Sequence, residues 1–459
     1  MASKTYIATD PAPTVERESG GLWLVFQLDR LVVLSICGLL AFAILAFGAT
    51  EYWAMCSVQV VSAALLVLWA AGQLARGKLE VSFSSLFAPM LLLSLLIAFQ
   101  LLWPKTEYWY ATWVRSLQWI SYAILFFLST QVMRGGPRLR NVGLFLACFG
   151  FLVAILAIAQ GGTATEKVYW LFQSESGSPL YGPYPNHAHY AGLMEMLFPI
   201  ALVFGMGLEF RLQARMLLFF AAIVMSGSIF LAASLGGILS LFGQLALLAI
   251  IALRGRRRSQ LWRSALGLLL LLSLFAVMLQ PTTLEERLQH WKSKSEQMEV
   301  TGRLAIVRDS MAMVVKRPIV GYGLGTFIEV FPRHRTFYTN SIVNAAHNEY
   351  VQVSVEMGVA GLILVLALIA LLFRQALRKS LGWQHDFEAA MALAALIGCS
   401  GILIHSLCDF NLQIPANAAL FSVLAGVAVS KPMSLRISDH DRRMRKIHRW
   451  ELLKSDPQL

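Results

Sequence analysis

Twelve apolar runs alternate with polar segments along the chain, and most are long enough to form a membrane-spanning helix. A helix needs about 20 predominantly apolar residues to cross the hydrocarbon core of a bilayer. The pattern predicts spans at residues 31–48, 54–74, 84–103, 111–132, 139–160, 188–207, 214–233, 236–253, 264–280, 355–376, 388–407 and 412–430. We therefore expect an all-α polytopic membrane protein with about 12 transmembrane helices.

Two of the connecting segments, 161–187 and 281–354, are much longer than the others. In the second, apolar residues recur with helical spacing over 301–316, and Pro318 ends the pattern. The glycine-rich stretch 321–325 predicts a turn, because it lacks the Lys-Ser/Thr pair that a phosphate-binding loop needs. We expect the long loop between spans 9 and 10 to form an ordered, partly helical cap over one end of the bundle.

Composition agrees with this class, since 57% of residues are hydrophobic and only 14% are charged. A soluble globular protein carries about 25% charged residues, so that class is excluded, and so is a disordered chain. The net charge of +12 is explained better by basic cytoplasmic loops than by nucleic-acid binding. The strongly basic run 254–258 is placed in the cytoplasm, and alternation of the spans then predicts that both termini are cytoplasmic.

Polar side chains gather near the predicted outer ends of three spans, in residues 186–190, 347–349 and 405–409. Polar groups are costly at membrane depth, so they often mark a functional site or a water-filled cavity. Simpler interpretations remain open for two of these clusters. The residues at 186–190 could cap a helix or lie among lipid headgroups, and His405 and Asp409 could pair across one helical turn.

Metal binding has little support in the sequence. His187 and His189 are two residues apart and do not share a helix face, and no HExxH motif or Cys/His set accompanies them. The five cysteines lie in or at the ends of apolar runs without a CxxC pair, which is typical of small buried hydrophobic residues. We expect neither a metal nor another cofactor.

The long loop carries His347 and several arginines above an apolar bundle, among them Arg303, Arg317, Arg333 and Arg335. These arginines could form a solvated face. A cationic, partly desolvated pocket beside lipid would instead suit a lipid phosphate or pyrophosphate, because the guanidinium fork matches phosphate geometry. A neutral histidine beside it could accept a proton from an attacking hydroxyl.

Three motifs carry a family resemblance. They are Thr301-Gly302-Arg303 through Pro318-Ile319-Val320-Gly321-Tyr322-Gly323-Leu324-Gly325-Thr326-Phe327 with Ala346-His347-Asn348-Glu349-Tyr350-Val351-Gln352 and Glu356-Met357-Gly358-Val359-Ala360-Gly361; Gly182-Pro183-Tyr184-Pro185-Asn186-His187-Ala188-His189-Tyr190-Ala191-Gly192; and Asp409-Phe410-Asn411-Leu412-Gln413-Ile414-Pro415-Ala416-Asn417. Over roughly residues 30–430 the sequence resembles the O-antigen ligase and polymerase superfamily of bacterial membrane glycosyltransferases. The last two motifs resemble the branch that builds exopolysaccharide.

The resemblance implies a GT-C-like fold in the bacterial inner membrane, with the active site facing the periplasm. It implies a glycan donor carried on undecaprenyl pyrophosphate, an acceptor hydroxyl on a glycan or lipid, inversion at the anomeric carbon and no metal. His347 would be the base or would orient the acceptor, and Arg303 would hold the pyrophosphate. The residues expected to bind pyrophosphate or glycan are Arg333, Arg335, Arg317, Asn186, His187, His189, Asn348, Glu349 and Asp409.

The chain departs from the family pattern at Leu235, where similar proteins have an arginine in a Ser-Arg-Gly sequence. Arg333, Arg335 or Arg317 would have to compensate, or else the activity differs. The predicted organisation is a cytoplasmic tail at 1–30, helices 1–9 at 31–280, a catalytic periplasmic loop at 281–354, helices 10–12 at 355–430 and a basic cytoplasmic tail at 431–459.

Three functions fit these features. A polymerase would use lipid-linked glycans as both donor and acceptor, whereas a ligase would move a finished glycan to lipid A core or to protein. The exopolysaccharide-like motifs and the absence of an added acceptor domain favour the polymerase, and such a system leaves room for polysaccharide-assembly partner proteins. A lipid or solute transporter is the third candidate, but the expected repeat symmetry and broken helices are not evident in the sequence.

Overall fold

The computed structural model describes residues 14–102, 106–163, 167–173, 181–207, 210–253, 294–339 and 342–431. The ninth predicted span, 264–280, lies outside these residues, as do the basic run 254–258 and the C-terminal tail beyond Lys431. The structure therefore tests eleven of the twelve predicted spans.

The described chain is almost entirely helical. The longer helices are α1 (Thr14–Leu45), α2 (Tyr52–Ala75), α3 (Phe87–Leu102), α4 (Trp109–Val132), α5 (Gly136–Gly162), α6 (His187–Gly207), α7 (Leu212–Leu231), α8 (Leu235–Leu253), α11 (Lys294–Lys316), α13 (Glu349–Lys379), α14 (Phe387–His405) and α15 (Pro415–Val429). The short elements are helix α12 (Phe327–Val330), the 3₁₀ turns η1 (Phe47–Ala49), η2 (Phe331–Arg333) and η3 (Asn411–Gln413), and a hairpin of β1 (Lys167–Val168) and β2 (Phe172–Gln173).

Eight of the described helices are long and apolar enough to cross a membrane: α1 over Phe26–Leu45, α2, α5, α6, α7, α8 over Leu235–Ala252, α13 and α14. Helices α3 and α15 are apolar but shorter. A helix covers most of each of the eleven predicted spans described here, so the all-α polytopic class is confirmed, whereas the count of twelve stays a prediction. Helix α1 begins at Thr14, well before residue 31, and α13 begins at Glu349 instead of 355.

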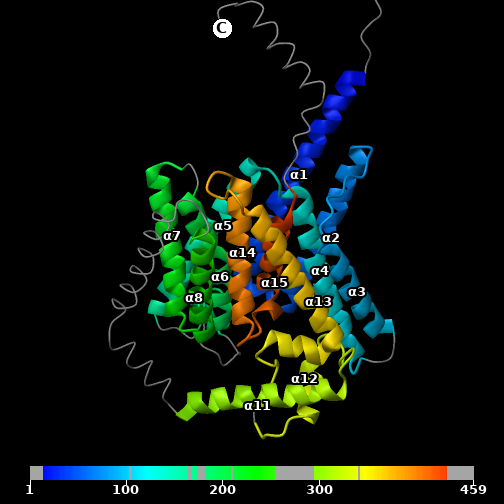
Figure 1. Cartoon of the computed structure of the whole chain (residues 1–459), viewed down its shortest axis with the longest axis vertical. Helices are drawn as coiled ribbons and strands as arrows, with labels where there is room; N and C mark the ends of the chain where they lie inside the picture. The colour runs from blue at the N-terminus through cyan, green and yellow to red at the C-terminus, as the bar shows by residue number, and fades with distance from the viewer. Residues whose placement is uncertain are drawn as a thin grey trace, which may run out of the picture.

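The helices form a bundle in which α6 and α14 occupy the centre (Figure 1). Almost every side chain of these two helices is buried, because both are apolar on all sides and rich in small residues. Helix α11 lies across one end of the bundle, below α13 and α12 (Figure 1). We call this end the α11 end.

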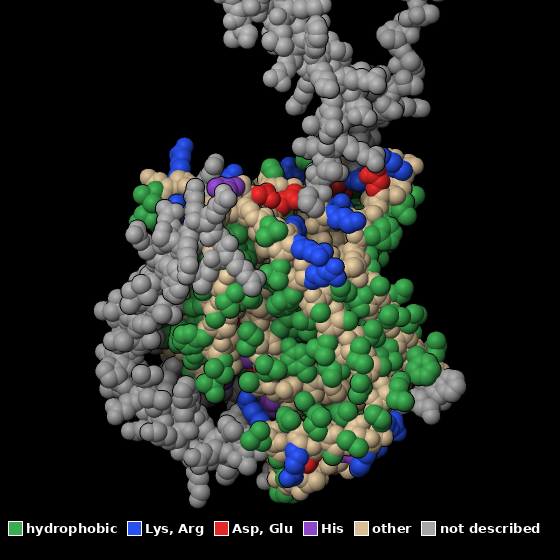
Figure 2. Space-filling model, viewed as in Figure 1, with side chains coloured by type: hydrophobic (Ala, Val, Ile, Leu, Met, Phe, Trp, Pro, Cys, Tyr) green, Lys and Arg blue, Asp and Glu red, His purple; other side chains and the backbone are tan. Residues whose placement is uncertain are grey.

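Hydrophobic side chains dominate the middle of the surface, while Lys and Arg lie mainly toward the two ends (Figure 2). This distribution is typical of a bundle whose middle faces lipid and whose ends face water. It agrees with the multi-pass membrane character that the helices themselves indicate.

Helix α13 is broken at Gly358, where φ +67° and ψ −173° are not helical. An added Cβ there would lie 2.2 Å from the carbonyl oxygen of Ile319, so only glycine fits. The break frees backbone groups, and the incoming chain uses them: the Val359 amide donates to the Pro318 oxygen at 2.7 Å. The chain after α11 is thereby fixed against α13.

The glycine-rich stretch 321–325 follows directly and is non-helical, as predicted. Its three glycines all have positive φ. The Gly323 amide donates to the Glu356 carbonyl at 2.9 Å, and Gln100 Nε2 donates to the Glu356 and Val320 carbonyls at 2.8 and 2.7 Å. This stretch therefore docks the α11 cap onto α3 and α13.

Candidate active site

His347 lies at the entrance to α13, at the α11 end of the bundle. Its φ of +50° is left-handed, which is uncommon for a residue with a side chain. The next residue, Asn348, caps the helix, because its side-chain oxygen accepts from the Val351 amide at 3.0 Å. Asn348 Nδ2 also donates to the Leu407 carbonyl at 2.9 Å. The cap and this second bond hold His347 in a conformation that costs free energy.

The imidazole of His347 faces the carboxylate of Asp409, with Nδ1 3.7 Å from Oδ1. This separation exceeds ordinary hydrogen-bond length, so the contact is electrostatic. Asp409 is buried, whereas the His347 side chain is 23% exposed. Burial opposes ionisation, but His347 and the nearby rings of His189 and His405 outweigh it and hold the pKa of Asp409 below its usual range.

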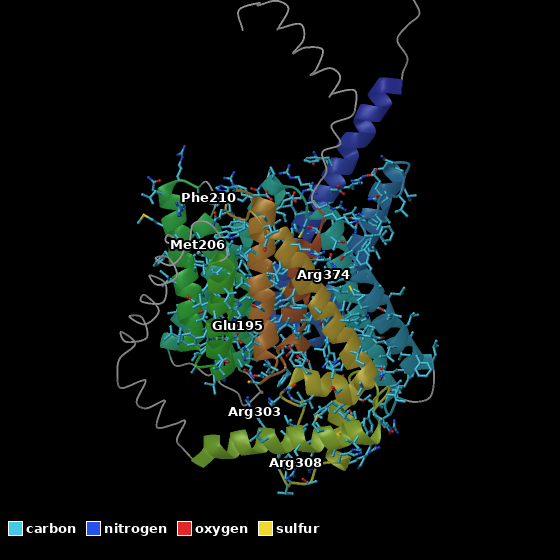
Figure 3. All side chains as sticks on the ribbon, in the orientation of Figure 1. Glu195, Met206, Phe210, Arg303, Arg308 and Arg374 are labelled. Carbon is cyan, nitrogen blue, oxygen red and sulfur yellow. The ribbon has the colours of Figure 1, made fainter. Side chains whose placement is uncertain are left out.

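Arg303 approaches the same segment from α11. Its Nη1 donates to the carbonyl of Cys408 at 3.3 Å, one residue before Asp409. Figure 3 places Arg303 on the side of α11 nearer the bundle and Arg308 on the opposite side. The structure thus brings together the two predicted catalytic residues, Arg303 and His347, on either side of residues 408–409.

The start of α6 reaches the same place. His189 is buried, and its Nδ1 lies 2.8 Å from Oδ1 of Asn411. Phe410 lies between two imidazoles, with ring centroids 4.8 Å from His189 and 5.2 Å from His347. The three polar clusters predicted from the sequence therefore converge on residues 405–411.

Two other predicted site residues at α6 have structural contacts. The side-chain oxygen of Asn186 accepts from the Ala188 amide at 2.8 Å and caps the helix. His187 Nδ1 lies 2.7 Å from the Ala232 carbonyl, in the turn between α7 and α8. The capping interpretation of this cluster thus applies to Asn186.

Glu349, the first residue of α13, faces the segment from another side. Its Oε1 accepts from the Leu412 amide at 3.0 Å, and its own amide donates to the Ser406 carbonyl at 2.9 Å. Both ends of the 406–412 segment are therefore tied to α13, which fixes Asp409 relative to His347.

The remaining predicted arginines lie elsewhere. Arg317 forms an ion pair with Glu107, whose other oxygen is 3.8 Å from Nη1 of Arg333, and Arg335 donates to the Thr339 carbonyl at 3.4 Å. Along α11, Arg303 and the last residue, Lys316, are separated by about 20 Å at 1.5 Å per residue. The geometry places Arg317 and Arg333 around Glu107, so their predicted binding roles stay predictions.

His405 and Asp409 interact electrostatically, but the direct ion pair suggested for them is not among the contacts of the described residues. Helix α14 ends at His405, so Asp409 lies beyond its last turn and turns to His347 instead. His405 Nδ1 is 2.8 Å from Oε1 of Glu195, and both side chains are almost completely buried. Figure 3 shows Glu195 deep in the bundle near α14.

Sequence reasoning missed two charged residues inside the predicted spans, Glu195 on α6 and Arg115 on α4. Charged side chains in spans usually face the bundle interior and mark functional positions, which is the signal that could have found them. Among the described residues, no three His, Cys, Asp or Glu side chains are gathered so that they could hold a metal ion.

Residues 220–366 match the family model described as O-antigen ligase. This match covers about a third of the chain and supports the resemblance to the O-antigen ligase and polymerase superfamily. The matched O-antigen ligase segment runs from α7 into α13 and includes both Arg303 and His347. No curated protein sequence matches the chain.

The match confirms the predicted resemblance and supports a glycosyltransferase-like enzyme, and the apolar helices agree with a multi-pass membrane protein. Leu235, where the resemblance predicted an arginine, begins α8 and is 55% exposed. The glycine after it is required, since a Cβ on Gly236 would lie 2.4 Å from the His405 ring. The first turn of α8 thus packs on the buried Glu195–His405 pair.

Proposed function

We propose that this protein transfers a glycan from undecaprenyl pyrophosphate to an acceptor hydroxyl at the periplasmic face of the bacterial inner membrane. In this proposal the α11 end of the bundle faces the periplasm and both termini are cytoplasmic. The single observation that carries it is the approach of His347 and Arg303 to residues 408–409, within a family of membrane glycosyltransferases.

His347 is the general base in the proposed step. Because Nδ1 faces Asp409, Nε2 is the atom that takes the proton from the acceptor hydroxyl. The ionised Asp409 stabilises the imidazolium that results. A base in such a position typically contributes about 10²–10⁴-fold to the rate.

The acceptor oxygen forms a bond to the anomeric carbon, and the bond from that carbon to the pyrophosphate oxygen breaks. Attack from the opposite side inverts the configuration. Arg303 balances the charge that develops on the departing lipid pyrophosphate, and a positioned donor of this kind is worth about 10²–10³-fold. No metal is needed, because the leaving group is already activated and its charge is met by arginine.

The polymerase is the form of this reaction that we favour, with a lipid-linked repeat unit as acceptor. The support is the pair of exopolysaccharide-like motifs, 182–192 and 409–417, both of which contribute to the site through His189, Asp409 and Asn411. Purified protein incubated with lipid-linked repeat units and no other acceptor should form a glycan ladder. A ligase would form no ladder and would need lipid A core or protein as acceptor.

The catalytic assignment is tested with variants of the purified protein. His347→Ala should lower transfer about 10²–10⁴-fold and Arg303→Ala about 10²–10³-fold, with unfolding temperatures close to wild type. Arg308→Ala is the matched control, because Arg308 is on the other side of α11 with a side chain that is 71% exposed. Near-full transfer by either site variant would remove that residue from the mechanism.

A further inference from the structure

Arg115 lies on the interior face of α4, about two turns from the α11 end of that helix. The exposed side chains of α4 follow one face: Trp109, Trp113 and Ile120 are 54, 43 and 50% exposed. With 3.6 residues per turn, Arg115 points about 200° away from Trp113, into the bundle. A charged residue in this position faces either a partner or a water-filled space.

The side chain of Arg115 is partly exposed although its neighbours on the interior face are not. Thr112, Ser116 and Gln118 are 0, 4 and 6% exposed, whereas Arg115 falls in the intermediate range. A partly accessible arginine on the interior face is therefore not enclosed completely by the described side chains. This combination of interior direction and accessibility is what a binding site inside a membrane bundle requires.

The glycine-rich stretch 321–325 makes room for Arg115. A Cβ on Gly325 would lie 2.2 Å from Arg115 Cγ, so a larger residue there would displace the arginine. The Gly325 amide donates to Glu356 Oε2 at 2.8 Å, and Gln352 Nε2 donates to Oε1 at 3.0 Å. The oxygens of Glu356 are thus each engaged by a donor other than Arg115.

Most of the hydrogen-bonding capacity of Arg115 is unused within the described chain. A guanidinium has five N–H donors. Arg115 makes one hydrogen bond among the described residues, to Gln118 Oε1 at 2.9 Å, and it forms no ion pair there. It lies close enough to Glu349 and Glu356 to interact with them electrostatically, so the guanidinium has two acidic side chains as neighbours.

This arrangement suits a saccharide better than a phosphate. A phosphate offers mainly acceptor oxygens, which match the guanidinium of Arg115 but not the acceptor oxygens of the neighbouring glutamates. Sugar hydroxyls both donate and accept hydrogen bonds, so they can use guanidinium and carboxylate groups together. The Cα atoms of Glu349 and His347 are two residues apart and therefore within about 7 Å, which brings such a sugar to the proposed base.

We propose that Arg115 and Glu349 bind hydroxyl groups of the acceptor saccharide. The two arginines approach the same segment from different elements: Arg303 reaches it at Cys408, and Arg115 lies near Glu349, which contacts Leu412. Pyrophosphate and acceptor sugar thus have separate recognition groups. This inference rests on the proposed function, because it assigns a substrate to one side of the same site.

Binding to the full-length protein in detergent tests the assignment with two probes, inorganic pyrophosphate and a repeat-unit oligosaccharide released from its lipid carrier. Arg115→Gln should weaken oligosaccharide binding about tenfold or more and leave pyrophosphate binding unchanged. Arg303→Ala should weaken pyrophosphate binding and leave oligosaccharide binding unchanged. Arg140→Ala is the matched control, since Arg140 is an exposed arginine on another membrane helix, α5.

Equal or greater loss of pyrophosphate binding in Arg115→Gln would show an anion site and overturn the inference. Unchanged binding of both probes, or no oligosaccharide binding by the wild type, would also overturn it. Arg115→Lys keeps the charge with fewer, differently placed donors, and serves if Arg115→Gln does not fold; it should weaken only the oligosaccharide. Failure of the proposed function is distinct, because the wild type would then transfer no glycan from the lipid-linked donor.

Discussion

The buried pair of Glu195 and His405 gives the sharpest test of how this site is supported. Their side chains are 0 and 1% exposed and 2.8 Å apart, and the second carboxylate oxygen of Glu195 has no hydrogen-bond partner among the described residues. Removing one partner of a buried ion pair typically costs about 3–5 kcal/mol, because the other is left without compensation. We expect His405→Leu to lose stability in this range.

Replacing Glu195 instead of His405 should cost less stability. Glu195→Met leaves a histidine, which can remain neutral, so the loss is that of an unsatisfied buried polar group, about 1–3 kcal/mol. The double variant should recover most of the loss, since replacing a buried pair by apolar residues of similar volume is often neutral or stabilising. The structure thus predicts a coupling energy of several kcal/mol between the two positions.

The measurement is the free energy of unfolding of the four proteins in mixed micelles, analysed as a double-mutant cycle. Glycan transfer is followed in parallel, because the His405 carbonyl accepts from the Asp409 amide at 3.1 Å. Additive losses in the double variant would refute the reasoning, since they would show that the two side chains do not interact.

Three further predictions follow from the site and its supports. The pKa of Asp409 is below its usual range, so its contribution to stability is complete above the unfolded pKa of about 3.9 and is lost only as pH falls through the lower folded pKa. Unfolding midpoints should therefore show no Asp409-dependent change between pH 5 and 8. Asp409→Asn should lower transfer at every pH in that window. Gly358→Ala should destabilise the protein by more than about 1 kcal/mol in thermal unfolding, whereas Gly302→Ala, which meets nothing within 4 Å, should not. Chelation by EDTA should leave transfer unchanged, and a loss restored by a divalent ion would contradict the metal-free mechanism.

The membrane helices and the three polar clusters were predictable from the sequence alone. Apolar length is enough to recognise a span, and polar residues at span ends are costly enough to stand out. In the structure the ends of α6, α13 and α14 lie at the same end of the bundle. This arrangement brings His189, His347 and Asp409 together.

The contacts of individual charges were not predictable. A four-residue spacing suggested that His405 pairs with Asp409, but that rule applies only while the helix continues, and α14 ends at His405. Likewise, nothing in the loop sequence shows that Arg317 pairs with Glu107, more than 200 residues earlier. Such partners depend on how the loop folds back over the bundle.

The effect of having Leu235 in place of the expected arginine was also not predictable from the sequence. The structure shows why small residues follow it, since Gly236 and Gly237 pack against His405 and Ala191. It does not place another arginine from the loop at that position among the described residues. We expect the leaving group to depend mainly on Arg303.

The most direct test of the central claim is glycan transfer by purified wild-type and His347→Ala protein from one lipid-linked repeat-unit preparation. We expect product with the wild type and a loss of about 10²–10⁴-fold in the variant, with the fold intact. No product from the wild type, or equal product from both, would contradict that claim.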